Sequence, residues 1–285
     1  MMHELRIRVG PAAFRIGSAW RAPVAALERL YAAYPTPSYC DYTVRLEPAR
    51  PWRKWLRPSV MISGDYMLPD AAPLPLSQGL LAAEMGMNLQ MALGWRRHLL
   101  LHAGAAEKDG RALVMTGMSG SGKSTMAALL GESGWRFLSD EFALLGLQDG
   151  AVHPFPRLVS LKNEGIEALE QRVGHQRLGP RLRGTPKGDI RHLVPPRDAI
   201  QRMDEAALPR LILFPRFGEA RAIRTVPPSE LFMRLTQAST NYVALGEAGF
   251  AALTRFCETV PARAIDYRRG EEGLELIDQL WAQCP

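Results

Sequence analysis

The sequence predicts an α/β protein in two parts, an α+β region over residues 1–95 and a domain built on a phosphate-binding loop over residues 96–285. Alternating apolar residues near the N-terminus predict half-buried strands. An apolar run at 112–116, a glycine-rich turn and a helical run at 125–130 predict strand, loop and helix. Two Asp-Gly turns predict hairpins, so we expect a mixed sheet in the second part.

The first part begins with half-buried strands, predicted where apolar residues alternate with polar ones at 5–9 and 42–46. Residues 22–33 have helical spacing between them. A proline-rich stretch at 69–75 interrupts the pattern, and residues 80–95 predict a long apolar helix. We expect three methionines of this helix to fill the core rather than to bind a cofactor: Met85, Met87 and Met91.

The second part opens with two predicted strands, 99–101 and 112–116, joined by a hairpin turn at Asp109-Gly110. Gly134 ends the helix that follows the loop, and 135–138 reads as the next strand. A second hairpin is expected between the strands that flank Asp149-Gly150, which are 143–147 and 151–153.

The rest of the chain alternates predicted strands and helices. Asn163 is expected to cap a short helix over 163–173, and the basic, Gly- and Pro-containing stretch 177–197 is expected to be a loop. Residues 210–214 predict a core strand. A short strand and three helices should complete the chain, at 222–226, 229–238, 247–258 and 272–283.

Composition indicates a soluble protein with a proper core, with 47% hydrophobic and 22% charged residues. A net charge of +6 suits polyphosphate ligands or acidic partners, without the clear basic stripe of nucleic-acid binders. Three widely spaced cysteines predict neither disulfides nor a zinc site. The N-terminus lacks an apolar signal core, and no apolar stretch approaches the roughly 20 residues of a spanning helix, so a cytoplasmic location is expected.

The loop itself spells G-x-x-x-x-G-K-[ST], the Walker A pattern. Glycines let the backbone N–H groups surround an anion, and the helix N-terminus adds its positive dipole. Lys123 would reach the β- and γ-phosphates of ATP, and Ser124 would bind Mg²⁺. The alternative is a glycine-rich turn that binds nothing. The predicted nucleotide-binding residues are Gly117, Met118, Ser119, Gly120, Ser121, Gly122, Lys123, Ser124 and Thr125.

A carboxylate should lie near the loop to position Mg²⁺. Strand 210–214 runs into Pro215-Arg216 and offers no acid, whereas Asp140-Glu141 closes the strand after the loop helix, which commonly returns beside the first strand. Either acid could hold the metal, and one could accept a proton from an attacking hydroxyl. A solvated acidic turn is the alternative. His102 ends the strand before the loop strand, where a structural or surface role competes with a catalytic one.

The basic stretch supplies one more candidate. Arginines and lysines surround Gly184 and Gly188, so a mobile cationic loop could close over the phosphates and stabilise transition-state charge. Lys187 is the preferred residue because Gly188 beside it permits close approach. A solvated surface loop is the alternative. The cations concerned are Arg177, Arg181, Arg183, Lys187 and Arg191.

Three motifs, in their order along the chain, resemble the catalytic domain of HPr kinase/phosphorylase, and most closely the HPr kinase-related proteins. The motifs are His102-Ala103, Gly117–Ser124 and Ser139-Asp140-Glu141. The resemblance covers about residues 96–245 and implies a P-loop kinase core of the HPr kinase type. It implies that Asp140 is the general base, that Ser124 binds Mg²⁺ and Lys123 the phosphates, and that His102 lies near the γ-phosphate.

The sequence departs from that family at three points. Glu141 stands where HPr kinase has Asp, and Arg181-Leu182-Arg183-Gly184 is the nearest match to a Glu-x-Arg-Gly signature whose glutamate serves the metal. The N-terminal region does not resemble that enzyme's N-terminal domain. Relatives include kinases that act on serine in ribosomal peptides, which indicates an acceptor other than HPr.

The sequence therefore predicts an Mg²⁺-dependent kinase that transfers the ATP γ-phosphoryl group to a hydroxyl, with Ser or Thr of a peptide or protein as the expected acceptor. A nucleotide-dependent regulatory ATPase and a small-molecule kinase remain open alternatives. The N-terminal region is expected to bind substrate or a partner, and a homo-oligomer is compatible with the sequence.

Overall fold

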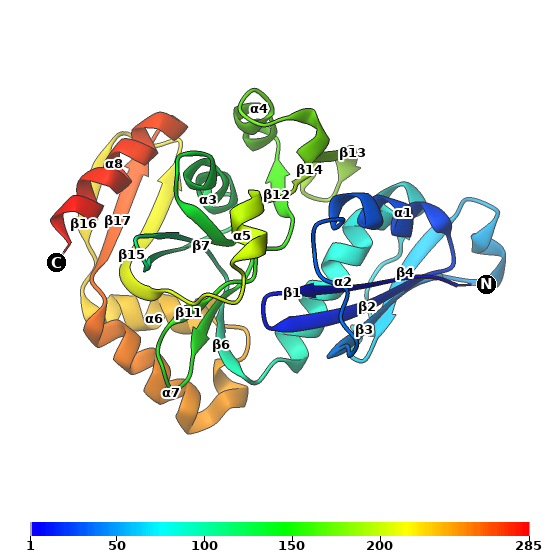
Figure 1. Cartoon of the computed structure of the whole chain (residues 1–285), viewed down its shortest axis with the longest axis horizontal. Helices are drawn as coiled ribbons and strands as arrows, with labels where there is room; N and C mark the ends of the chain where they lie inside the picture. Colours follow the sequence, from blue (N-terminus) through cyan, green and yellow to red (C-terminus); the bar gives the residue numbers. More distant parts are fainter. Residues whose placement is uncertain (1, 285) are drawn as a thin grey trace.

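The structure, a computed structural model, describes residues 2–284 and is a mixed α/β protein. Figure 1 shows two lobes side by side, with the first strands and helices in one and the C-terminal helices in the other. The chain ends lie at opposite extremes of this view. A strand pair and a short helix from the middle of the chain, described below, lie between the lobes.

The N-terminal lobe is a five-stranded sheet in the order β1-β2-β3-β4-β5. β2 and β3 are parallel and joined through α1, whereas the other neighbours are antiparallel. Helices α1 and α2 contact each other and the sheet. The elements are β1 (His3–Val9), β2 (Ala12–Ser18), α1 (Arg21–Leu30), β3 (Tyr42–Pro48), β4 (Ser59–Gly64), β5 (Leu74–Pro75) and α2 (Gly79–Gly94), with the short 3₁₀ turns η1 (Pro51–Lys54) and η2 (Leu76–Gln78).

The predicted strands and helices of this lobe are present, and sequence patterning missed β2, β4 and β5. β2 is buried on both faces except at Arg15, so its sequence does not alternate between apolar and polar residues. The core of the lobe also takes in residues from beyond position 95, among them Leu100, Leu144 and Phe155.

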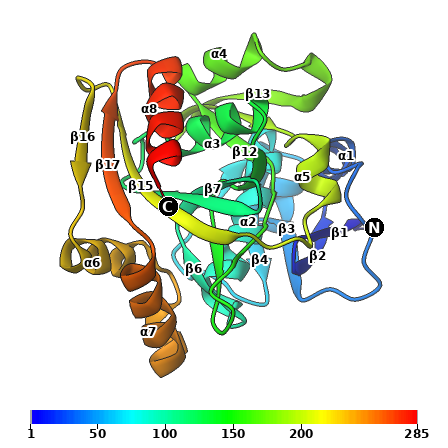
Figure 2. The same cartoon turned by 60° about the vertical axis from the view of Figure 1, so that its left-hand side comes forward.

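The second lobe is built on a six-stranded mixed sheet in the order β16-β17-β15-β8-β7-β9. Leu113 and Met115 of β8 face the core beneath α3 and α8, whereas Ala112 and Val114 face α6 and α7. Figure 2 shows α8 on one side of this sheet and α6 and α7 at its lower end. The elements are β7 (Ala103–Lys108), β8 (Arg111–Thr116), α3 (Lys123–Glu132), β9 (Arg136–Ser139), β15 (Leu208–Phe217), β16 (Ala222–Thr225), α6 (Pro228–Ala238), α7 (Tyr242–Thr259), β17 (Ala262–Tyr267) and α8 (Gly270–Gln283).

Two smaller sheets join the lobes. One has the order β11-β10-β6 and the other β12-β14-β13. The hairpin expected at Asp149-Gly150 is confirmed as β10 paired with β11. The remaining elements are β6 (His98–Leu101), β10 (Ala143–Gly146), β11 (Val152–His153), β12 (Val159–Lys162), α4 (Glu164–Glu170), η3 (His175–Arg177), β13 (Leu178–Thr185), β14 (Gly188–Leu193) and α5 (Arg197–Gln201).

Two predicted pairings were wrong. The Asp109-Gly110 turn joins β7 to β8, and the strand at 99–101 instead pairs with β10 in another sheet. β7 therefore lies between β8 and β9, so the strand that carries Asp140 does not lie directly beside the loop strand. β7 could not be recognised from its local pattern, because its Ala-Gly-Ala-Ala run lacks the β-branched and aromatic residues typical of strands.

The stretch 177–197 is not a loop but largely the β13–β14 hairpin. The chain reverses at Pro186-Lys187, between glycines with positive φ at Gly184 and Gly188. Glycine and proline therefore mark the turn of a hairpin here rather than an irregular segment. Near the C-terminus the three predicted helices and the strand at 222–226 are present, and a further strand, β17, was missed.

Candidate functional site

The phosphate-binding loop leaves the end of β8 and runs into α3, as the motif requires. Gly122 has a φ of 91°, and a Cβ there would lie 2.6 Å from the Tyr267 hydroxyl oxygen, so glycine is required on both counts. The Lys123 Nζ donates hydrogen bonds to the carbonyls of Gly117 (2.8 Å) and Met118 (2.9 Å). The lysine is thus held inside the loop that would receive the phosphates.

Asp140 follows β9 directly and is 5% exposed. Its Oδ2 accepts a hydrogen bond from the Ser160 backbone N–H at 2.9 Å, while its Oδ1 is buried with no hydrogen-bond partner among residues 2–284. Burial, and next the charge of Glu141, raise the pKa of Asp140 to about 6, against opposing effects from Ser124 and Ser160. A buried carboxylate with one free oxygen and a raised pKa is suited to accept a proton or to bind a cation.

His102 lies beside the acidic pair. Its Nδ1 is 3.6 Å from Glu141 Oε1. Burial lowers the pKa of His102, and the positive charges of Lys123, Lys162 and Lys187 lower it further, whereas Glu141 opposes them. The imidazole is therefore held largely neutral near pH 7 and can act as a hydrogen-bond donor or acceptor.

A cavity of about 870 Å³ brings these residues together. The predicted residues that line it are His102, Ser119, Gly120, Gly122, Lys123, Ser124, Thr125, Asp140, Glu141 and Lys187. Gly117, Met118 and Ser121 complete the loop without lining this cavity, and Met118 is 84% exposed. At a size within the range of ligand pockets, the cavity has room for a nucleoside triphosphate.

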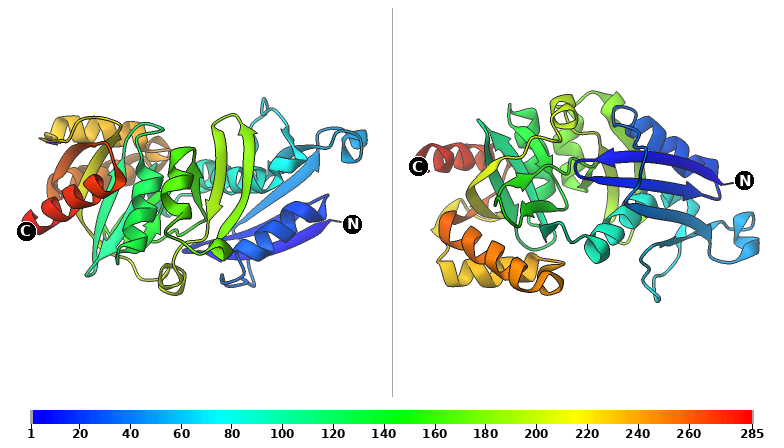
Figure 3. Two further views of the ribbon diagram at one scale, coloured as in Figure 1. Left: turned by 90° about the horizontal axis from the view of Figure 1, so that it is seen from above. Right: turned by 60° about the horizontal axis from the view of Figure 1, so that its bottom comes forward.

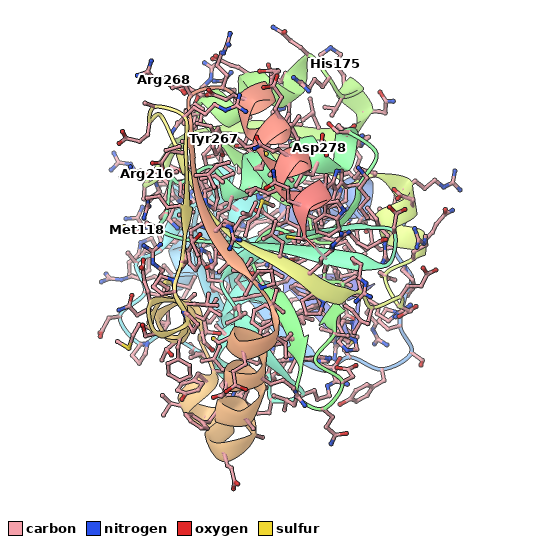
Figure 4. All side chains as sticks on the ribbon, turned by 90° about the vertical axis from the view of Figure 1, so that its left-hand side faces the viewer. Met118, His175, Arg216, Tyr267, Arg268 and Asp278 are labelled. Carbon is pink, nitrogen blue, oxygen red and sulfur yellow. The ribbon has the colours of Figure 1, made fainter. Side chains whose placement is uncertain are left out.

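The end of β17 and the start of α8 also form part of the cavity wall, and Tyr267 lies directly against the loop at Gly122. Tyr267, Arg268 and Arg269 line it there, together with Phe217 from the end of β15. Figure 4 shows Met118, Arg216, Tyr267 and Arg268 toward the same side of the molecule. The carboxyl ends of parallel strands meet at one sheet edge, which is where ligands bind in open α/β sheets.

The predicted cationic loop is replaced by a hairpin whose arginines are mostly engaged. Arg177 pairs with Glu132 (2.7 Å), Arg181 with Asp189 (3.0 Å) and Arg191 with Glu170. Lys187 differs from them, because it is exposed at the hairpin turn and lines the cavity of about 870 Å³. The Thr185 hydroxyl holds this turn by donating to the Gly188 carbonyl (2.6 Å).

Asn163 precedes α4, as predicted for an N-cap, but its side chain makes no capping hydrogen bond. Its Oδ1 accepts instead from the Asp189 N–H at 3.2 Å, and thereby ties α4 to the β13–β14 hairpin. The predicted capping interaction was therefore wrong, because a tertiary partner takes up the side chain.

Sequence reasoning missed Ser160 and Lys162, which line the same cavity from β12. In Val159-Ser160-Leu161-Lys162 the apolar residues are buried and the polar pair faces the site. This period-two alternation was the available signal. Burial lowers the pKa of Lys123, and the charge of Lys162 lowers it further while opposing the rise in the pKa of Asp140, so Lys162 belongs to the electrostatics of the site.

Ser124, Asp140 and Glu141 present oxygen atoms to one cavity, the ligand type that Mg²⁺ prefers. The partnerless Asp140 Oδ1 fits a cation held jointly by protein and phosphate oxygens. Across residues 2–284, no group of three or more His, Cys, Asp or Glu side chains could hold a metal by itself. This arrangement agrees with the usual Mg²⁺ sites, where one or two carboxylates act together with substrate phosphates and water.

Comparison of the sequence with models of known protein families and with curated proteins gave no match. Among the helices that the structure describes, none is long and apolar enough to cross a membrane.

Proposed function

We propose that the protein is an Mg²⁺-dependent kinase that transfers the ATP γ-phosphoryl group to a Ser or Thr hydroxyl of a peptide or protein. Its core is then a P-loop kinase of the HPr kinase type. The observation that carries the proposal is the Asp140 carboxylate, which is buried at the phosphate loop with its Oδ1 free of hydrogen bonds.

In the proposed reaction the β- and γ-phosphates lie in the loop, where Lys123 exchanges its two loop carbonyls for phosphate oxygens. Asp140 Oδ1 accepts the proton of the acceptor hydroxyl as its oxygen bonds to the γ-phosphorus. The bond from that phosphorus to the bridging oxygen breaks, and ADP leaves. Ser124 and Glu141 would hold Mg²⁺ beside Asp140, and the ion would neutralise phosphate charge, so that Asp140 Oδ1 stays free for the proton.

His102 and Lys187 take supporting roles in this reaction. His102, kept largely neutral, would donate a hydrogen bond toward the transferred group, oriented by Glu141 3.6 Å away. Lys187 would place positive charge near the phosphoryl group as it moves.

The alternative function is a regulatory ATPase that controls a partner. The observation that favours it is Arg181, which forms an ion pair with Asp189 on the hairpin at the position where the related kinases carry a metal-serving glutamate.

The test is incubation of γ-labelled ATP and Mg²⁺ with an extract of the source cell and either native protein or Asp140→Asn. General-base catalysis contributes about 10²–10⁴-fold, so we expect labelled protein or peptide with the native enzyme alone. The matched control is Asp278→Asn on the exposed face of α8, which should retain transfer. Label released only as free phosphate would favour the regulatory ATPase.

A further inference from the structure

A second cavity, of about 140 Å³, lies where the two lobes meet. Its walls come from α2, from the chain around β12 and from the β13–β14 hairpin. Figure 3 (left) shows this hairpin standing between the lobes. We call this second cavity the junction cavity, and the cavity of about 870 Å³ at the phosphate loop the nucleotide cavity. The two share five lining residues and so adjoin at Asp140: Asp140, Glu141, Ser160, Lys162 and Lys187.

The walls of the junction cavity are mostly apolar. One side chain expected to be core filler, Met85, is 46% exposed and lines this cavity from α2, whereas Met87 and Met91 are buried as predicted. An apolar cavity of about 150 Å³ is known to bind benzene, so this one accommodates a single ring or a branched aliphatic side chain. The other apolar lining residues are Leu74, Leu81, Phe155, Leu158, Pro186 and Ile190.

Two buried polar side chains that line the same cavity have nitrogen atoms without a hydrogen-bond partner among the described residues. His192 is 1% exposed, and neither of its ring nitrogens has a hydrogen-bond partner within the described chain. Arg157 donates to Asn88 and Glu84 through its terminal nitrogens, but its buried Nε has no partner there. Buried polar groups are nearly always hydrogen-bonded, so these atoms indicate a missing partner.

The partner they suit is a peptide. Burial lowers the pKa of His192, and the resulting neutral imidazole offers one donor and one acceptor, as a peptide unit does. Arg157 Nε adds a further donor for a carbonyl. A small apolar alcohol could fill the apolar space but would leave these groups unpaired.

We propose that the junction cavity is the acceptor site, and that it selects a Ser or Thr hydroxyl with a large apolar residue beside it in a peptide chain. The inference rests on the proposed kinase function and extends it to the substrate class. In this proposal the apolar side chain occupies the space that Met85 and Ile190 help to line, His192 and Arg157 bond the peptide backbone, and the hydroxyl meets Asp140, which lines both cavities.

The probes are blocked nonapeptides with one central serine, in which each neighbouring position is in turn Leu, Ala or Asp. Transfer from γ-labelled ATP and binding to the ADP–Mg²⁺ form, by saturation-transfer NMR, are measured separately. The test variant is Met85→Trp, which fills the cavity mouth from an exposed position. Leu93→Trp is the matched control, since Leu93 is also exposed on α2 but does not line the cavity.

We expect kcat/KM at least tenfold higher for Leu than for Asp at one neighbouring position, and a loss of at least tenfold in Met85→Trp but not in Leu93→Trp. If the peptides bind with this Leu preference and with dependence on Met85, but no phosphoryl group is transferred to them, the acceptor-site proposal stands and the kinase proposal is overturned. Transfer without either dependence would sustain the kinase and overturn the acceptor site. Failure of every peptide to bind would also overturn the acceptor site.

Discussion

The nucleotide cavity and the junction cavity share Asp140 but are built in different ways. The nucleotide cavity takes its wall at the phosphate loop from one segment, residues 119–126 without Ser121, and the rest of its wall from elements that include β12, α4 and the start of α8. The junction cavity has no such local segment and is assembled from α2, the chain around β12 and the β13–β14 hairpin. A wall made by one segment can be recognised from its local pattern. A site made by distant segments can change its walls without disturbing the loop, and so is the better place to set specificity.

Their electrostatics differ as well. Lysines and arginines from several elements line the nucleotide cavity, among them Lys123, Lys162 and Arg268. Apart from the residues that the two cavities share, the charged side chains that line the junction cavity form a buried network, in which Glu84 pairs with Arg157 and accepts a hydrogen bond from the Tyr31 hydroxyl at 2.8 Å. The first arrangement suits a polyanion, and the second fixes one lobe against the other.

The largest effect that separates the two sites should come from Arg157→Met. It leaves Glu84 buried without its counter-ion, and breaking such a pair costs about 3–5 kcal/mol. We expect the free energy of unfolding to fall by that amount, measured by urea denaturation, while the affinity for ATP in the folded protein is unchanged. An equal loss of nucleotide affinity would mean that the two sites are not separable.

The matched control for this variant is the double change Glu84→Gln with Arg157→Met, which removes both charges. We expect it to regain more than half of the lost stability, because no buried charge then lacks a partner. A double variant no more stable than the single one would show that packing, not charge, holds this junction.

The next effect concerns Asp140, which both cavities share. Its pKa is raised from the ordinary 3.8 to about 6, so between these values the folded protein keeps a proton that the unfolded chain has lost. Stability from this group is therefore full below pH 4 and is lost as pH rises through 6, by at most about 3 kcal/mol. In Mg²⁺-free urea titrations, Asp140→Asn should gain stability relative to native protein across this range, whereas Asp278→Asn should show no such trend.

The sequence predicted the loop, its flanking strand and helix, and the acidic pair, because each depends on neighbours in the chain. The sequence pattern did not predict β7, whose small residues form a strand only because β8 and β9 pair with it on either side. It also failed at the β13–β14 hairpin, where arginines look solvated in sequence but pair with acids such as Glu132, 45 residues away.

The junction cavity could not have been predicted for the same reason. Met85, Arg157 and His192 are unremarkable in their local patterns, and only the tertiary fold brings them to one space. The position of Lys162 on the polar face of its strand could have been predicted from the sequence, because the alternation in β12 places it on the opposite face from Leu161. The alternation of apolar and polar residues thus indicated which side chains share one face of β12, but not which parts of the molecule that face contacts.

A smaller effect would test the nucleotide side alone. Lys123→Met removes the charge that should bind the phosphates, worth about 1.5–3 kcal/mol for hydrogen bonds between charged partners. Because Lys123 must first leave the Gly117 and Met118 carbonyls, we expect a net loss of about 2 kcal/mol, or about 30-fold in the Kd for ATP by calorimetry. Peptide binding at the junction should persist, and Lys108→Met, on an exposed side chain, is the control.

The smallest effect should fall on Lys187, which lines both cavities from the hairpin turn. Its side chain is exposed, so solvent and salt screen its charge and its contribution to the transition state is modest. We expect Lys187→Ala to lower kcat about tenfold, with unchanged Kd for ATP and with a weaker dependence of kcat on salt. Arg183→Ala, exposed on the same hairpin but outside both cavities, should leave kcat unchanged. Equal losses in the two variants would assign the effect to the hairpin's overall charge, and Lys187 would then have no place between the nucleotide and the acceptor.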